Sequence, residues 1–140
     1  MRKLAIIALV AAACHRGPPP GTSLTGAPSP REAAVQFLNA ARAQDLQAMG
    51  SYWGNEKGPA RDFLDRSELD KRLIIMQMCY DHERFEILDE REGSQGERLV
   101  RIQLFRGNRS KTPTFKVIRG PSNRWYVLDA DYAAMGDFCR

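Results

Sequence analysis

The chain carries three kinds of hydrophobic pattern in succession. An unbroken apolar run, Leu4–Ala13, follows two basic residues, Arg2 and Lys3. From Ser29 onward apolar residues recur at three- and four-residue spacing, and after His82 the spacing becomes two. These periods are those of amphipathic helices and of half-buried strands. The pattern therefore predicts an apolar N-terminal segment, then helices, then strands.

Three helices are expected in the middle of the chain. The run Ser29–Glu32 supplies a capping hydroxyl, a first-turn proline and an acidic side chain at the start of the first helix. Asp45 offers the N-cap of a second helix that stops at Gly54-Asn55, and a third is expected from Ser67 to about Tyr80. Because the run Leu73–Cys79 is apolar nearly all round, we expect the end of the third helix to be buried.

Four strands follow, separated by turns rich in glycine, asparagine and serine: Phe85–Leu88, Leu99–Phe105, Thr114–Ile118 and Arg124–Ala130. Helices followed by hairpin-linked strands predict an α+β fold, with N-terminal helices packed on an antiparallel sheet of about four strands. The expected core residues are Phe37, Phe85, Val100, Ile102, Leu104, Phe115, Val117 and Trp125. They either fill the interior or form the apolar wall of a pocket.

The N-terminal apolar run ends at a cysteine. Val10–Cys14 resembles the lipobox of bacterial lipoproteins, which implies that residues 1–13 are a signal peptide and that Cys14 is lipidated. The proportions are those of an export signal, whereas a spanning helix needs roughly 20 apolar residues. An ordinary secretory signal or a buried N-terminal helix are the alternatives. Since His15 is not the aspartate associated with inner-membrane retention, the resemblance favours a lipid-anchored protein of the outer membrane.

Residues 14–30 form the next unit. They contain five prolines, three glycines and, after Cys14, one large apolar side chain, Leu24. Such a composition cannot bury enough surface to offset the entropy of ordering, so we expect a lipidated cysteine followed by a disordered tether. The alternative is an extended arm packed on the domain. The remaining residues, 31–140, are enough for a single domain.

Two segments are similar to the nuclear transport factor two-like superfamily, which includes SnoaL-like and ketosteroid isomerase-like proteins. Residues 33–49 resemble its opening helix pair, and Arg124–Asp129 its last strand. The likeness spans about residues 29–132 and implies a cone in which a curved sheet wraps helices around a pocket. With the lipobox, the chain looks like small envelope lipoproteins that carry one such domain.

The resemblance implies that an enzyme of this type would place an aspartate or histidine inside the cone, beside tyrosine donors. The candidates are His82, Asp81 and Asp129, with Tyr80, Glu83 and Tyr126 as neighbours. A histidine–carboxylate pair can move protons near neutral pH. The alternative is that residues 80–83 form the polar junction between the last helix and the first strand. No catalytic residue of the superfamily maps onto a matching motif, and the histidine and cysteine spacing predicts neither a metal site nor a cofactor.

Cys79 and Cys139 remain as a pair once Cys14 is lipidated. In an oxidising compartment such an even pair favours a disulfide. It would pin the C-terminal segment across the third helix. The alternative is a buried free thiol at Cys79 and a frayed end at Cys139.

Charge is unevenly distributed, although the formal net charge is only +4. Residues 98–128 contain basic residues and no acidic one: Arg98, Arg101, Arg106, Arg109, Lys111, Lys116, Arg119 and Arg124. This predicts an electropositive sheet face, with Arg101, Arg106, Arg109 and Lys111 available to an acidic envelope partner or to anionic headgroups. The alternative is pairing with Glu86, Asp89, Glu90 and Glu92 on the neighbouring strand. Nucleic acid is not an expected partner of an exported protein with so small a net charge.

These observations favour a membrane-anchored envelope lipoprotein that acts as a non-catalytic binding or accessory module. It would present a pocket to a small apolar ligand, or its basic face to an acidic partner. An isomerase-like or hydrolase-like enzyme that uses a polar site in the cone is one alternative. A structural accessory of an envelope or secretion assembly is the other.

Overall fold

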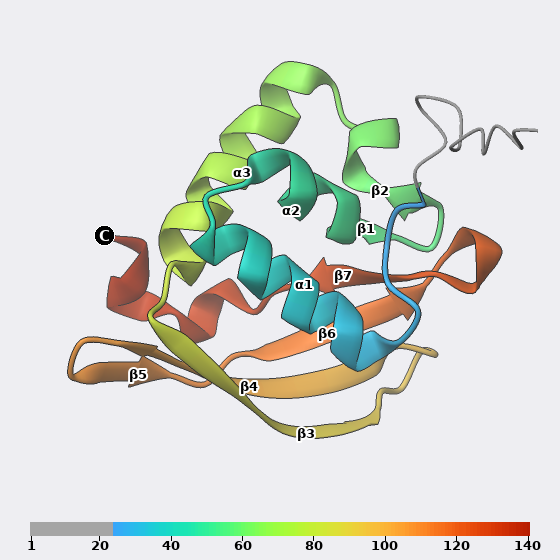
Figure 1. The fold of residues 1–140 in the computed structure, drawn as a ribbon. Helices are drawn as coiled ribbons and strands as arrows, with labels where there is room; N and C mark the ends of the chain where they lie inside the picture. Colours follow the sequence, from blue (N-terminus) through green and yellow to red (C-terminus); the bar gives the residue numbers. More distant parts are fainter. Residues whose placement is uncertain (1–23) are drawn as a thin grey trace, which may run out of the picture.

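The computed structural model describes residues 24–140. The expected signal peptide, Cys14 and the first part of the expected tether lie outside the described residues. The described chain has an α+β fold in which helices lie on one face of an antiparallel sheet (Figure 1). None of its helices is both long enough and apolar enough to cross a bilayer.

The three helices are α1 (Pro30–Arg42), α2 (Leu46–Tyr52) and α3 (Arg66–Tyr80). Each begins after a side-chain cap that accepts a hydrogen bond from the backbone N–H three residues on: Ser29, Asp45 and Asp65. Such caps satisfy donors that the first helical turn leaves free. The first two caps are those predicted from the sequence. The third helix begins earlier than expected because Asp65 supplies its cap.

The main sheet has five strands rather than four. They are β3 (Arg84–Glu92), β4 (Arg98–Arg106), β5 (Arg109–Lys111), β6 (Thr114–Arg119) and β7 (Trp125–Asp129). The order is β3-β4-β6-β7, and β5 pairs with the end of β4 that β6 leaves free. A second, two-stranded sheet joins β1 (Gly54–Asn55) to β2 (Gly58–Pro59). Short 3-10 helices complete the fold: η1 (Ala60–Asp62), η2 (Pro121–Asn123), η3 (Tyr132–Ala134) and η4 (Gly136–Cys139).

The interior between helices and sheet is filled by side chains. Helix α1 contacts β4, β6 and β7 (Figure 1). At the centre, the rings of Phe37, Tyr80 and Phe115 pack edge to face with their centroids 5.6 to 5.9 Å apart. All three are fully buried, and edge-to-face pairs add stabilisation beyond the area they bury. Of the expected core residues, Phe85 and Trp125 are only partly buried, at the margin of this cluster.

The prediction of a disordered tether as far as Pro30 does not hold for residues 25–29, which follow the packed-arm alternative. Ala27 is 1% exposed and exchanges two backbone hydrogen bonds with Trp125. Arg124 donates from its guanidinium to the carbonyls of Thr25 and Gly26. These contacts satisfy the backbone of a segment that has few apolar side chains, so the domain begins near Thr25.

The apolar composition of α3 predicted that its C-terminal end is buried all round, and this prediction is wrong for one face. Leu73, Met76, Cys79 and Tyr80 are buried. Ile74, Ile75 and Met78 are about half exposed because they lie on the opposite face, which no other described element covers.

Candidate functional site

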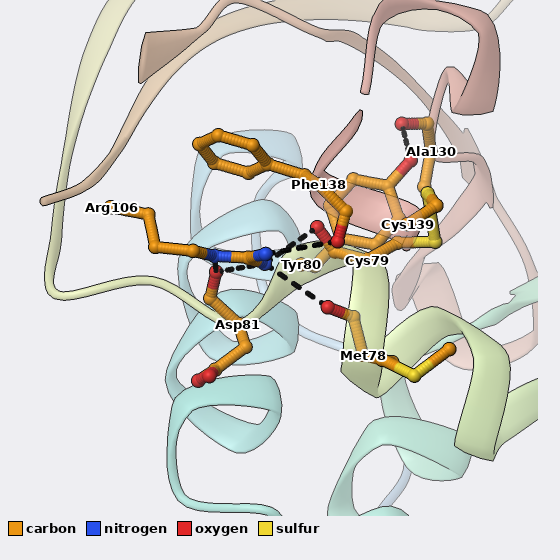
Figure 2. The surroundings of a disulfide bond; sticks show 8 residues. All are labelled: Met78, Cys79, Tyr80, Asp81, Arg106, Ala130, Phe138 and Cys139. Atoms are coloured by element: carbon orange, nitrogen blue, oxygen red, sulfur yellow. Dashed lines mark hydrogen bonds between the residues drawn. A yellow bond between two sulfur atoms is a disulfide. The ribbon is translucent and has the colours of Figure 1, made fainter. Parts of the chain in front are cut away.

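The C-terminal segment is fastened to the end of α3. The sulfur atoms of Cys79 and Cys139 lie 2.11 Å apart, at disulfide distance, and join residues 60 positions apart in sequence (Figure 2). Phe138, immediately before Cys139, is fully buried. The pair predicted from the sequence is therefore brought together, and it holds η4 against the helix.

Arg106, at the end of β4, contacts both the end of α3 and the C-terminal segment. Its guanidinium donates to the carbonyls of Met78, Cys79 and Asp81 around the end of α3, at 2.6 to 3.3 Å (Figure 2). It also donates to the carbonyl of Phe138, at 2.9 Å, and lies 4.2 Å from the centroid of that ring. The last carbonyls of a helix have no partner within the helix. One arginine therefore caps α3 and ties it to the C-terminal segment.

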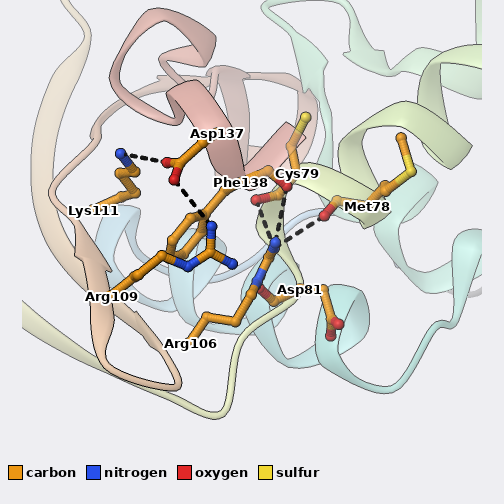
Figure 3. A network of polar contacts seen from close by, with 8 residues as sticks. All are labelled: Met78, Cys79, Asp81, Arg106, Arg109, Lys111, Asp137 and Phe138. Carbon is orange, nitrogen blue, oxygen red and sulfur yellow. Dashed lines mark hydrogen bonds and ion pairs between the residues drawn. The ribbon is translucent and has the colours of Figure 1, made fainter. Parts of the chain in front are cut away.

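Asp137 adds an ion-pair cluster on the outer side of η4. Its carboxylate lies 2.8 Å from Lys111 Nζ and 3.0 Å from Arg109 Nη1 (Figure 3). Hydrogen bonds from Lys111 and then Arg109 lower the pKa of Asp137 to about 2. The hairpin that carries β5 is thus joined to the same C-terminal segment.

The residues expected to form a basic binding face are all engaged within the protein. Arg106 binds carbonyls, Arg109 and Lys111 bind Asp137, and Arg101 donates to Asp89 at 2.8 Å. Arg98 similarly pairs with Glu90 and Glu92 on β3. Arg98 and Arg101 thus follow the alternative of pairing with the neighbouring strand, whereas Arg106, Arg109 and Lys111 bind groups at the end of α3 and in η4.

His82 lies at the junction of α3 and β3 and is 5% exposed. Its Nδ1–H donates to the carbonyl of Tyr80 at 2.8 Å, and Nε2 has no partner among the described residues. Burial lowers the pKa of His82; the Tyr80 carbonyl opposes this shift, and the positive charge of Arg42 adds to it. Burial therefore favours the neutral form of the imidazole.

The other acid–base candidates are placed elsewhere. Tyr80 donates its hydroxyl hydrogen bond to the carbonyl of Ala130, and burial raises the pKa of Tyr80. Asp129 is exposed and accepts from the backbone N–H of Asp131 at 2.8 Å. Asp81 is partly exposed. Within residues 24–140, no three histidine, cysteine or acidic side chains gather as a metal ion would require.

A groove that the sequence did not indicate lies between α2, η1 and α3. Its volume is about 450 Å³. Four leucines line it, Leu46, Leu64, Leu69 and Leu73, and Arg61, Arg66, Gln47 and Asp70 bring polar groups to it. A smaller hollow of about 220 Å³ lies beside the N-terminal arm and η2. Neither opening is lined by His82, Asp81 or Asp129. No known protein family, curated protein or solved structure matches this chain.

Proposed function

We propose that this chain is a lipid-anchored envelope protein whose folded domain binds a small ligand without transforming it. The observation that supports a binding role is the groove between α2 and α3. Its volume of about 450 Å³ is within the range of small-molecule sites, and it combines apolar walls with a few polar groups.

A non-catalytic role is supported by where the acid–base candidates lie. General acid–base catalysis requires a group within hydrogen-bond reach of the substrate proton. His82 is enclosed by protein, Asp129 faces solvent, and neither lines the groove between α2 and α3 or the smaller hollow beside the N-terminal arm. A substrate in the groove would therefore not meet them.

We further propose that the fold is a variant of the nuclear transport factor two-like cone. Support comes from three helices that precede the main antiparallel sheet and cover one of its faces, and from the resemblance of residues 33–49 and 124–129 to that superfamily. In this variant Phe37, Tyr80 and Phe115 occupy the space between helices and sheet. Binding would then take place outside the cone.

Anchoring rests on Val10–Cys14, whose resemblance to a lipobox supports attachment through a lipidated Cys14. Two or more acyl chains hold a protein firmly on a membrane, whereas one holds it weakly. The test is fractionation of cells that express the native chain or Cys14→Ser. The native chain should resist extraction with salt and partition into detergent with a diacylglyceryl mass on its N-terminal peptide. An unmodified Cys14 in the native chain would contradict the anchor.

Binding is tested by native mass spectrometry of residues 15–140, exported behind a cleavable secretory signal so that the protein is soluble and oxidised. A reproducible adduct that disappears on denaturation is the expected result. A bare protein mass from several growth conditions would contradict the binding function.

A further inference from the structure

The groove has an apolar floor built by three segments. Leu46 comes from α2, Leu64 from the turn after η1, and Leu69 and Leu73 from successive turns of α3. Leu73 is buried, and the other three are partly exposed. An apolar molecule that covers these partly exposed leucines removes their surface from water, which favours binding.

Gly50 deepens this floor at the cost of helix stability. It is a buried glycine inside α2, where alanine would be more favourable by about 0.5–1 kcal/mol. A Cβ at this position would come 3.4 Å from Leu73 Cδ1, the near limit of ordinary van der Waals contact, so a methyl group would fit there and occupy space that the groove now has. An isolated glycine in a helix usually has a packing or functional reason. Here it leaves room in the groove.

Two arginines, Arg61 and Arg66, line the groove near the start of α3. Arg61 is in η1 and Arg66 begins α3, and both are exposed. Neither forms an ion pair with another residue in the part of the chain that the structure describes, in contrast to the arginines of β4. Asp70, one helical turn beyond Arg66, also lines the groove, so negative charge in a ligand is favoured beside the arginines and disfavoured beside Asp70.

We propose that the groove binds a single-chain amphiphile with a carboxylate head, such as a medium-chain fatty acid. The acyl chain would lie on the four leucines, and the carboxylate would lie between Arg61 and Arg66, whose planar guanidinium groups match its geometry. This inference rests on the proposed binding function and names the ligand class of that site.

The test is isothermal titration calorimetry of sodium decanoate, kept below its micelle-forming concentration, into residues 15–140, which include every described residue. Saturable one-to-one binding is expected. Arg61→Ala with Arg66→Ala should weaken it by about tenfold or more, since a hydrogen bond to a charged group is worth at least that factor. Gln47→Trp, which places a large ring at the exposed edge of the groove, should abolish it.

The matched control is Arg91→Ala with Lys116→Ala. It removes the same charge from exposed positions on β3 and β6 and should change affinity by no more than about twofold. On the unaltered protein, decyltrimethylammonium, which has the same chain length and a cationic head, should bind at least about tenfold more weakly than decanoate.

Three results would overturn the proposal: no decanoate binding, equal binding of the cationic amphiphile, or equal weakening by the control pair. If decanoate fails while native mass spectrometry still detects a different adduct, the ligand class is wrong and the binding function stands. If both measurements find nothing, the binding function fails as well.

Discussion

Replacing Arg106 with leucine should lower the free energy of unfolding by about 3 kcal/mol. The guanidinium donates to the carbonyls of four residues, three of them around the end of α3 and one in η4. A hydrogen bond to a charged group contributes roughly 1.5–3 kcal/mol, but bonds from one group do not add. Because Arg106 is only partly buried, water can replace some of these donors. The expected loss therefore corresponds to one or two such bonds.

The measurement is urea unfolding at pH 7, followed by circular dichroism, with the cysteine pair kept oxidised. The matched control is Arg101→Leu, on the same strand. Arg101 pairs with Asp89 at a site where both side chains are more than 40% exposed, and exposed pairs contribute only about 0.2–1 kcal/mol.

A second variant separates charge from geometry. Arg106→Lys keeps the positive charge, but an ammonium on a flexible stem cannot span the four carbonyls, so most of the loss should persist. Equal effects of Arg106→Leu and Arg101→Leu would refute the reasoning, because they would show that the carbonyls around α3 gain nothing specific from the guanidinium.

Three further predictions concern other parts of the domain. Cys79→Ser with Cys139→Ser should lower the free energy of unfolding by about 4 kcal/mol in the chain-entropy model. Alkylation of the unaltered protein with and without reductant should reveal two thiols that only the reductant exposes. Equal masses of the two alkylated samples would contradict the bond. Burial lowers the pKa of His82 in the folded protein, so as pH falls the imidazole is protonated in the unfolded chain before it is in the folded one. The free energy of unfolding should therefore fall as pH decreases below about 6.5. Urea midpoints at pH 7.5 and 5.5 should differ less in His82→Gln, and an unchanged difference would assign the pH dependence to other groups. Gly50→Ala should leave the urea midpoint unchanged or raised while weakening decanoate binding, and a variant that bound as tightly as the parent would show that the glycine is not needed for the groove.

The helices and most strands could be predicted from the sequence because their signals are local. Ser29 and Asp45 cap helices whose apolar faces have the helical period, and the strands alternate. Strand β5 could not be found in this way. Its residues, Arg109, Ser110 and Lys111, are all polar, and it is a strand because the turn at Gly107 folds it back onto β4.

The N-terminal arm and the groove depend on tertiary contacts and so leave little local signal. The arm is held by backbone hydrogen bonds between Ala27 and Trp125, which no hydrophobic pattern records. The groove arises where α2, η1 and α3 meet, and its leucines look like ordinary helix residues in the sequence. The local feature that could have pointed to it is Gly50, a glycine inside a helical pattern, but a lone glycine does not by itself predict a groove.

The sequence shows that residues 98–128 carry basic and no acidic side chains, but it does not show which of these cations are available to a partner. Arg101 lies on the exposed face of β4, whereas Arg106 follows the buried Val100, Ile102 and Leu104 at two-residue spacing and so lies on the helix side of the strand. Whether each is available to a partner depends on which neighbour it meets, Asp89 for one and the end of α3 for the other. Composition does not determine these neighbours.

The backbone pairing of Ala27 with Trp125 also bears on how copies of this domain behave when crowded together. Strand β7 is the last strand of the sheet, and an open edge can recruit a strand from another molecule. The arm, together with the bridge between Trp53 and Val127, covers that edge. The opposite edge, β3, carries several exposed charged side chains, which discourage such pairing. Copies of the domain at high local concentration can thus lie side by side without their sheets joining into larger aggregates.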